Sequence, residues 1–176
     1  VRGYDARFKV NPPLRRDEDV QAVREGLADG TIDIVATDHA PHPDESKSCE
    51  WQAAANGMVG LESALRVVHQ AMVETGMLTW DAVARVMSAA PARIGRLSGA
   101  GTPLEAGAPA SLTLYDPAPV RTFARGDLHG RSVNSPYLGR DLPGEVRWTL
   151  FRGAATVEDA VVAATMGAPV GTGVRA

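Results

Sequence analysis

The sequence predicts an α/β fold, and three observations lead to this prediction. The side chains of ARFKV at residues 6–10 alternate between polar and apolar, as in a short strand. A helical pattern follows, and then the β-branched, almost continuously apolar segment TIDIVAT at residues 31–37. Such a segment is typical of a strand buried on both faces of a parallel sheet. Strand, helix and buried strand in this order form a βαβ unit.

The further elements are predicted from periodicity and from helix-end signals. Asp17 is expected to cap a helix that carries Val20, Val23 and Leu27 on one face and ends at Gly30. Helices are also expected at about 61–74, at 80–89 after a Thr79 cap, and from Pro91 to near Leu97. After Gly99 the short apolar runs 111–116 and 145–153 alternate with Gly and Pro, which indicates a small β domain.

Composition and charge exclude several classes of protein. The chain of 176 residues is 44% hydrophobic and 22% charged, as in globular proteins. No stretch approaches the ~18 apolar residues of a membrane span, and the net charge of -3 argues against a general nucleic-acid binder. The single cysteine, Cys49, cannot form an internal disulfide, so we expect a cytoplasmic protein.

The segment with the clearest chemistry is IVATDHAPH, where the predicted buried strand ends. Asp38 stands at this end, followed by His39 and His42. A carboxylate there can ligate a metal, act as a general base, or do both. The alternative is that Asp38 caps a turn and both histidines are solvated. A charged residue at the end of a buried strand is unusual without a partner, which favours a functional site.

Three motifs in register resemble the C-terminal part of the type I dihydroorotases of the amidohydrolase superfamily. The motifs are KVNPPLR, IVATDHAPH and GMVGLESAL, and the resemblance runs from about residue 1 to residue 153. It implies a (β/α)8 barrel with a small β-sandwich domain. Residues 1–100 would then belong to the C-terminal βα units of the barrel and residues 101–165 to part of the sandwich. Residues 166–176 would form a flexible tail.

The resemblance also implies an activity and roles for single residues. Members of this family bind one or two Zn²⁺ ions and interconvert N-carbamoyl-L-aspartate and dihydroorotate in pyrimidine synthesis. Asp38 matches a metal ligand that also shuttles a proton, and His42 matches the histidine that hydrogen-bonds the substrate carboxylate. Asn11 matches the asparagine that contacts the substrate ring. Asn56 and Gly57 match a dipeptide whose backbone amides hold the substrate. For His39 we expect a role in orienting the loop rather than in binding metal.

Ordinary roles are expected for the other candidate side chains. Arg15 is expected to be solvated or ion-paired, His69 to pack or lie on the surface, and Cys49 to be a loop cysteine without a metal. His129 lies in the predicted β domain without an evident partner.

The sequence departs from the family pattern in two ways. The position before Gly57 is usually aromatic in the family and is Asn56 here. The HxH pair, the bridging lysine and two further metal histidines of the family have no counterpart in these 176 residues. A catalytic zinc normally takes three protein ligands and a closed barrel needs ~250 residues. We therefore expect a catalytically incomplete segment of a longer enzyme, an expectation that the initial Val favours; a split protein and a truncated homologue are the alternatives.

Other functions and partners remain open at this stage. One alternative is a non-catalytic dihydroorotase-like partner of aspartate transcarbamoylase, and another is a sibling enzyme such as an allantoinase or hydantoinase. The expected partners are a small-molecule substrate and either a second copy of the chain or aspartate transcarbamoylase, with neither nucleic acid nor membrane.

Overall fold

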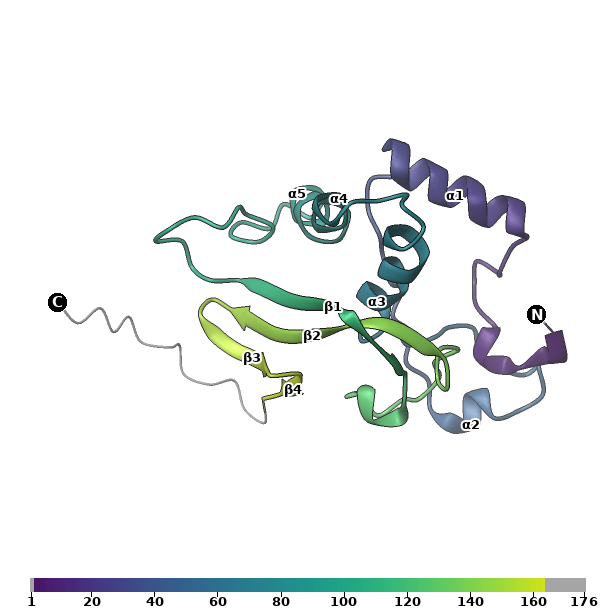
Figure 1. The fold of residues 1–176 in the computed structure, drawn as a ribbon. Helices are drawn as coiled ribbons and strands as arrows, with labels where there is room; N and C mark the ends of the chain where they lie inside the picture. The colour runs from purple at the N-terminus through teal and green to yellow at the C-terminus, as the bar shows by residue number, and fades with distance from the viewer. Residues whose placement is uncertain (1, 164–176) are drawn as a thin grey trace.

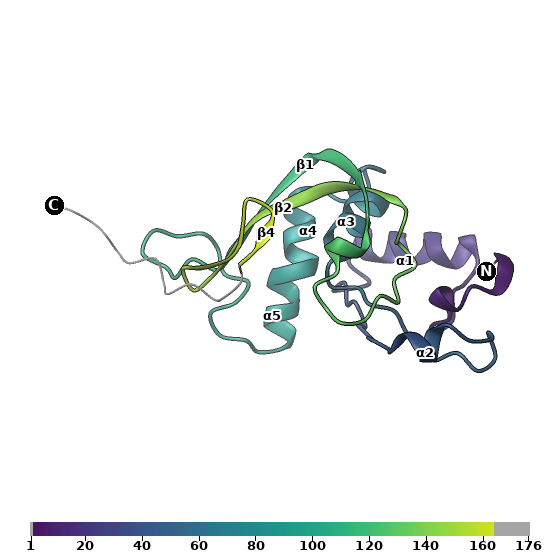
Figure 2. The same ribbon diagram turned by 90° about the horizontal axis from the view of Figure 1, so that it is seen from below.

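The computed structural model of the chain describes residues 2–163, so the predicted tail 166–176 lies outside the described residues. Helices occupy the first part of this range, and an antiparallel sheet of four strands occupies the last part (Figure 1). Seen from below, strands β1 and β2 arch over helix α3 and over the long helix formed by α4 and α5 (Figure 2). The structure is therefore mixed, with helices and an antiparallel sheet.

The predicted helices occur in the expected order, together with one short helix at 44–47 that was not predicted. They are α1 (Asp17–Asp29), α2 (Asp44–Lys47), α3 (Ala64–Val68) with a π-helical continuation (His69–Val73), and α4 (Trp80–Ala84), a π-helical turn (Arg85–Ala89) and α5 (Ala90–Ile94). Short 3-10 turns span Arg2–Tyr4, Ala6–Phe8 and Arg125–Asp127. Among residues 2–163, no helix has both the length and the apolar character that crossing a membrane requires.

The ends of the first helix are set by its neighbours in sequence. Gly30 ends α1 in the left-handed conformation at φ 89°, as predicted. The helix begins one residue earlier than expected, because Arg16 is the N-cap and Asp17 is already helical. The Asp19 carboxylate accepts a hydrogen bond from the Arg16 N–H at 3.3 Å, which satisfies a donor at the helix start.

The two helices expected at 80–89 and 91–97 form one continuous helix, which ends at Ile94. The predicted cap is confirmed, since the Thr79 hydroxyl accepts from the Ala82 N–H at 3.3 Å. Pro91 lacks an N–H group and would interrupt a regular helix. The π-helical turn Arg85–Ala89 directly precedes it and changes the hydrogen-bond spacing there, so the helix passes through the proline.

The sheet is a meander with strand order β1-β2-β3-β4. The strands are β1 (Leu112–Thr122), β2 (Asp141–Phe151), β3 (Ala154–Glu158) and β4 (Val161–Val162). The β1–β2 register shifts between Asp116 and Val120, where two prolines interrupt the donors of the ladder. Arg152–Gly153 and Asp159–Ala160 make the two short turns, and all four residues have positive φ, as tight hairpins require.

Two predicted strands are wrong. TIDIVAT at 31–37 forms no strand, and Thr31, Asp33 and Ala36 are exposed rather than buried. A strand needs a neighbouring strand, and in the described residues the segment has none: the Val35 N–H donates to the helical Val86 carbonyl at 3.1 Å, and an isolated parallel bridge from His39 to Met58 follows it. ARFKV contains a 3-10 turn instead, because the Asp5 carboxylate accepts from the Arg7 N–H at 2.9 Å and caps the turn.

The apolar core has two parts. The first packs helix α1 against the helices after residue 64 through Leu27, Val68, Met72, Leu78, Val83 and Val86. The second lies where the loop after Gly57 meets the sheet and contains Val59, Phe123, Leu128 and Leu142. The chain from Gly57 to Gly60 thus runs past the second core, which anchors one side of the predicted site.

A buried arginine joins α3 to the sheet. Arg66 is 5% exposed, and its guanidinium donates to the carbonyls of Leu142 at 2.5 Å, Arg121 at 2.9 Å and Pro143 at 3.3 Å. Burial lowers the pKa of Arg66 from its ordinary value. Because Arg121 pairs with Leu142 and Val120 pairs with Pro143, the guanidinium contacts adjoining residue pairs at the end of the β1–β2 ladder and holds α3 to it.

His69 is buried, in line with its expected packing role, and shares a second polar link with Tyr115 on β1. The Tyr115 hydroxyl donates to the Pro143 carbonyl at 3.0 Å and lies 2.9 Å from His69 Nδ1. A hydroxyl has one hydrogen to donate, so His69 Nδ1 must carry the proton of the second bond. Burial is the main cause that raises the pKa of Tyr115 to about 12.

Tyr115→Phe removes both hydrogen bonds and the titrating group. We expect it to lower the free energy of unfolding at neutral pH by about 1–2 kcal/mol, as for two ordinary hydrogen bonds. The unfolded chain loses the tyrosine proton near pH ~10, before the folded chain does at about 12, so this contribution declines as pH rises from ~10 to about 12. Urea unfolding across that range measures both effects.

The matched control is Tyr4→Phe, because Tyr4 is exposed. The account requires the alkaline loss of stability to be smaller in the Tyr115 variant than in the wild type and unchanged in the control. Equal pH dependence in all three proteins would contradict it.

Candidate functional site

Asp38 lies at the end of the extended segment 31–37, where the chain turns. Its backbone has φ 45°, an uncommon conformation for a residue with a side chain, and the residue is exposed. Beyond it, His39 pairs with Met58, and the Ala40 N–H donates to the Met58 carbonyl at 2.9 Å. Within residues 2–163 the Asp38 carboxylate makes no hydrogen bond. It is therefore a carboxylate held in place by its backbone and open to a ligand.

His39 holds this loop to the next one. Its Nδ1 accepts a hydrogen bond from the Gly60 N–H at 3.1 Å, so the neutral ring carries its proton on Nε2. This contact agrees with the expectation that His39 orients the loop.

His42 lies against the predicted substrate dipeptide. Its Nε2 lies 2.8 Å from the Asn56 carbonyl oxygen and therefore donates to it, since a carbonyl can only accept. The Asn134 side-chain oxygen accepts from the His42 N–H at 3.3 Å. The ring is half-buried and held at one nitrogen, which leaves Nδ1 as the position for a ligand.

Gly57 is required at its position for two reasons. Its φ of 135° lies in the region that favours glycine, and an added Cβ would come within 2.7 Å of Ala40 Cβ and 3.0 Å of His42 Nε2. Its N–H donates to the Lys9 carbonyl at 2.9 Å. Of the two backbone amides expected to hold substrate, only that of Asn56 makes no hydrogen bond within the described residues.

A buried lysine from α2 holds these loops together. The Lys47 ammonium donates to the carbonyls of Ala55 and Gly57, both at 2.9 Å, and of Lys9 at 3.2 Å. Burial, and secondarily the nearby Lys9 ammonium, lower the pKa of Lys47. The sequence gives no sign of this, because Lys47 belongs to the charged run DESK, which would ordinarily be solvated.

Asn134 reaches the same cluster from the loop between β1 and β2. Its side-chain Nδ2 donates to the carbonyls of Ala40 at 2.9 Å and Gly57 at 3.2 Å. An asparagine in a loop is ordinary, so the sequence does not single it out either. Asn11 is exposed and lies two residues after Lys9, whose ammonium donates to the carbonyls of Gln52 and Ala54.

The structure thus brings together most of the predicted site residues. Asn56, Gly57 and His42 belong to one hydrogen-bonded cluster, Asp38 lies four residues before His42, and Lys9 ties the Asn11 segment to it. An open hollow of about 630 Å³ adjoins this cluster, lined by His39, Pro41, Pro43, Asp44, Glu45, Gly130, Arg131 and Ser132.

The side chains that could ligate a metal do not by themselves form a metal centre. In the part of the chain that the structure describes, no three His, Cys, Asp or Glu side chains gather around a point that could hold an ion. Cys49 is exposed, and its Sγ donates to the Ser46 carbonyl. Asp38 is the one predicted ligand with an open carboxylate, and a catalytic zinc normally takes three protein ligands.

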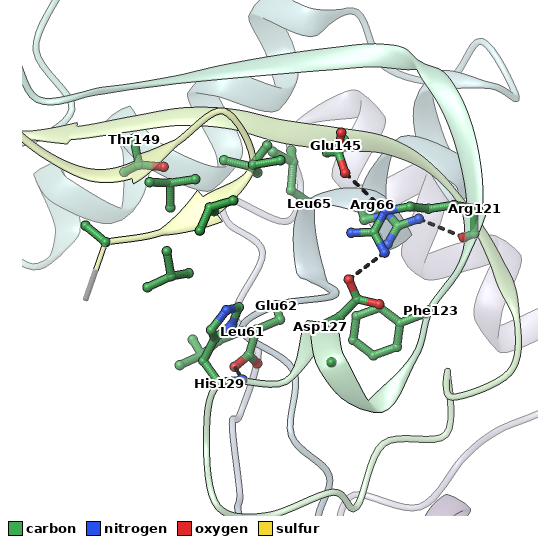
Figure 3. A pocket seen from close by; sticks show the side chains of 17 residues that line it. Leu61, Glu62, Leu65, Arg66, Arg121, Phe123, Asp127, His129, Glu145 and Thr149 are labelled. Atoms are coloured by element: carbon green, nitrogen blue, oxygen red, sulfur yellow. Dashed lines mark hydrogen bonds and ion pairs between the residues drawn. The ribbon is translucent and has the colours of Figure 1, made fainter.

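A second cavity, of about 640 Å³, lies away from the predicted residues, between α3 and the sheet (Figure 3). Arg121 crosses its wall, paired with Asp127 at 2.5 Å and Glu145 at 3.1 Å. Glu62 accepts from the His129 N–H at 3.1 Å, which gives the His129 loop its partner. Because Arg121 is neutralised by two carboxylates and Glu62 adds a further negative charge, the cavity is less suited to an anionic ligand than the loop cluster.

Comparisons with known proteins agree with this geometry. A model of the amidohydrolase family matches residues 10–156. The chain is 68% identical to a dihydroorotase of Leifsonia xyli subsp. xyli over 95% of its length, and 58% identical to one of Streptomyces coelicolor over 90%. A dihydroorotase of Mycobacterium tuberculosis is 50% identical over 92% of the chain.

Solved structures show the same fold. The chain resembles a D-hydantoinase from Thermus sp. with a TM-score of 0.81 at 25% identity, over 92% of this chain and 36% of that one. It resembles an L-hydantoinase from Arthrobacter aurescens with a TM-score of 0.79 at 29% identity, over 91% and 36%.

The matched region is a minor part of each relative. The chain spans 38% of the length of the Leifsonia protein and 37% of the Streptomyces and Mycobacterium proteins. The family model nevertheless matches 10–156, which is well over half of the chain. The chain therefore belongs to the amidohydrolase family.

Proposed function

We propose that this chain is part of a dihydroorotase, which reversibly cyclises N-carbamoyl-L-aspartate to (S)-dihydroorotate in pyrimidine synthesis. The observation that carries the proposal is the meeting of the three motif segments. Lys9 of the first accepts from Gly57 of the third, and His42 of the second donates to Asn56. The dihydroorotases that are 50–68% identical support this activity over others.

The residues present suit an anionic substrate. Dihydroorotate carries a carboxylate, and the side-chain amide of Asn11 and the N–H of Asn56 are donors of the kind that bind one. Because His42 Nε2 already donates to the Asn56 carbonyl, the open Nδ1 is a further donor only in the imidazolium form, which a bound carboxylate favours. In hydrolysis, the oxygen of water bonds to the ring carbonyl carbon, the C–N bond breaks, and the ring nitrogen takes a proton. Asp38 can take the proton from water and return it to that nitrogen, and cyclisation reverses these transfers.

Zinc enters the proposal through the family resemblance. We propose one or two Zn²⁺ ions, with Asp38 as one ligand and the remaining ligands supplied from outside these 176 residues. The described residues do not fit a complete site, since they bring one open carboxylate where three protein ligands are normal. On this proposal the chain alone is inactive.

The architecture follows from the same proposal. Residues 1–100 would be the C-terminal part of a (β/α)8 barrel, and residues 101–165 part of a small β-sandwich. Asp38 then lies at the carboxyl end of a barrel strand, the position at which barrels of this type carry their active sites. The position of Asp38 directly after the β-branched segment 31–37 supports this.

Sibling activities and partners are less well supported. The hydantoinases share the fold at 25–29% identity, below the 50–68% of the dihydroorotases, so a hydantoinase is the second candidate. Association with a second copy or with aspartate transcarbamoylase, and a cytoplasmic location, remain proposals from the sequence.

The direct test is dihydroorotate hydrolysis by the whole protein that carries this chain, in the wild type and in Asp38→Asn. Asparagine cannot shuttle a proton, so we expect kcat to fall by about 10²–10⁴-fold. Asp33→Asn is the matched control, since Asp33 lies on the same segment and pairs only weakly with Arg93, at 3.9 Å. A wild type that opens hydantoins but not dihydroorotate would instead favour the hydantoinase.

Gly57→Ala tests whether the dipeptide holds substrate. The added methyl meets Ala40 and the His42 ring, so we expect it to displace both the ring and the Asn56 amide and to raise KM by about 10–100-fold. Steady-state kinetics of the whole protein measures this change.

Gly30→Ala is the control for backbone strain alone. Gly30 also has positive φ, but nothing lies within 4 Å of an added Cβ. It should lower stability by about 1 kcal/mol and leave KM unchanged. An equal KM in the two variants would contradict the role assigned to Gly57.

A further inference from the structure

The buried ammonium of Lys47 forms no direct ion pair in the part of the chain that the structure describes, and the Asp5 carboxylate acts on it only from beyond salt-bridge distance. The residue is 7% exposed, and within the described residues it forms no salt bridge. Its three donors go instead to three backbone carbonyls at 2.9–3.2 Å. Burying a charge is unfavourable unless it is hydrogen-bonded, so the three carbonyls hold the ammonium in place. The ammonium in turn holds the three backbone segments to which these carbonyls belong.

The three carbonyls surround the residues expected to touch substrate. Those of Ala55 and Gly57 lie on either side of Asn56, whose N–H is the open donor and whose carbonyl holds His42. The carbonyl of Lys9 begins the segment that carries Asn11. A single ammonium therefore sets the orientation of the Asn56 peptide and its distance from the Asn11 segment.

Asn134 also holds the loop at Gly57, and it does so from the part of the chain that forms the sheet. It is 3% exposed and comes from the long β1–β2 loop. Its amide nitrogen shares the Gly57 carbonyl with Lys47, and its oxygen accepts from the His42 N–H. The Gly57 carbonyl thus receives two donors, and one asparagine fixes both the dipeptide and the backbone of His42.

We infer that Lys47 and Asn134 are positioning residues, which set the Asn56 amide and the His42 ring to receive the carboxylate of the substrate. The inference rests on the proposed function. Neither side chain reaches the open side of the cluster; both act through the Gly57 carbonyl. Substrate binding should therefore respond to their removal more than the proton transfers at Asp38 do.

The test is steady-state hydrolysis of dihydroorotate by the whole protein, with folding and zinc content measured on each variant. Lys47→Met keeps a side chain of similar length and removes all three donors. Asn134→Asp keeps the shape but presents an acceptor to the carbonyls of Ala40 and Gly57. For both we expect KM to rise about 10–100-fold, as when supporting hydrogen bonds around a site are lost. We expect kcat to stay within about 3-fold and zinc content to be unchanged.

The matched control is Arg66→Met. It removes another buried cation that donates to three backbone carbonyls, but those carbonyls, of Leu142, Arg121 and Pro143, lie on the sheet and not in the site loops. Its KM should stay within about 3-fold of the wild type even where its stability falls.

The outcomes separate the inference from the function on which it rests. An inactive, zinc-loaded wild type overturns the proposed function and the inference with it. An active wild type in which both variants keep KM, or lose kcat at constant KM, overturns the inference alone, as does an equal KM rise in Arg66→Met. If one variant does not fold, the other decides; if neither folds, the two residues are structural and the inference is wrong.

Discussion

The hydrogen bonds of the buried Lys47 ammonium are the interaction on which the candidate site depends. The site is made of loops, and loops leave carbonyls without the partners that helices and sheets provide. Lys47 supplies donors to three of these carbonyls from one point, and each belongs to a segment that carries or adjoins a predicted substrate residue. Without it, the backbone hydrogen bond from Gly57 to Lys9 would be the direct link between these two residues, and the Lys9 ammonium would hold the loop only at Gln52 and Ala54.

A buried cation that donates to backbone carbonyls also joins the helices to the sheet. Arg66 is buried and places its guanidinium on three carbonyls of the β1–β2 region, as Lys47 does in the loops. Asn134 connects the two regions, since it lies in the β1–β2 loop and bonds the backbone of His42 and Gly57. Polar side chains that donate to backbone carbonyls, together with apolar packing, therefore hold the sheet to the site.

Local signals in the sequence predict local structure well. Helix α1 and its Gly30 end, the Thr79 cap and the strands β1 and β2 are confirmed because each depends on residues close in sequence. The prediction of a strand at 31–37 is wrong because its apolar pattern is typical of a strand with neighbours on both sides. Residues 2–163 contain no strand that pairs with it. The predicted site residues are found by motif, and the meeting of His42, Asn56 and Gly57 in one cluster is then a structural result. Lys47 and Asn134 escape prediction because their contacts cross up to 94 residues.

The account treats this chain as the part of a dihydroorotase that holds the substrate carboxylate, and a crystal structure of the whole protein with dihydroorotate tests this most directly. It predicts the carboxylate oxygens within about 2.6–3.2 Å of His42 Nδ1 or the Asn11 side chain and of the Asn56 nitrogen. A carboxylate bound only by residues outside this chain, with the Asn56 and His42 groups free of substrate, would contradict it.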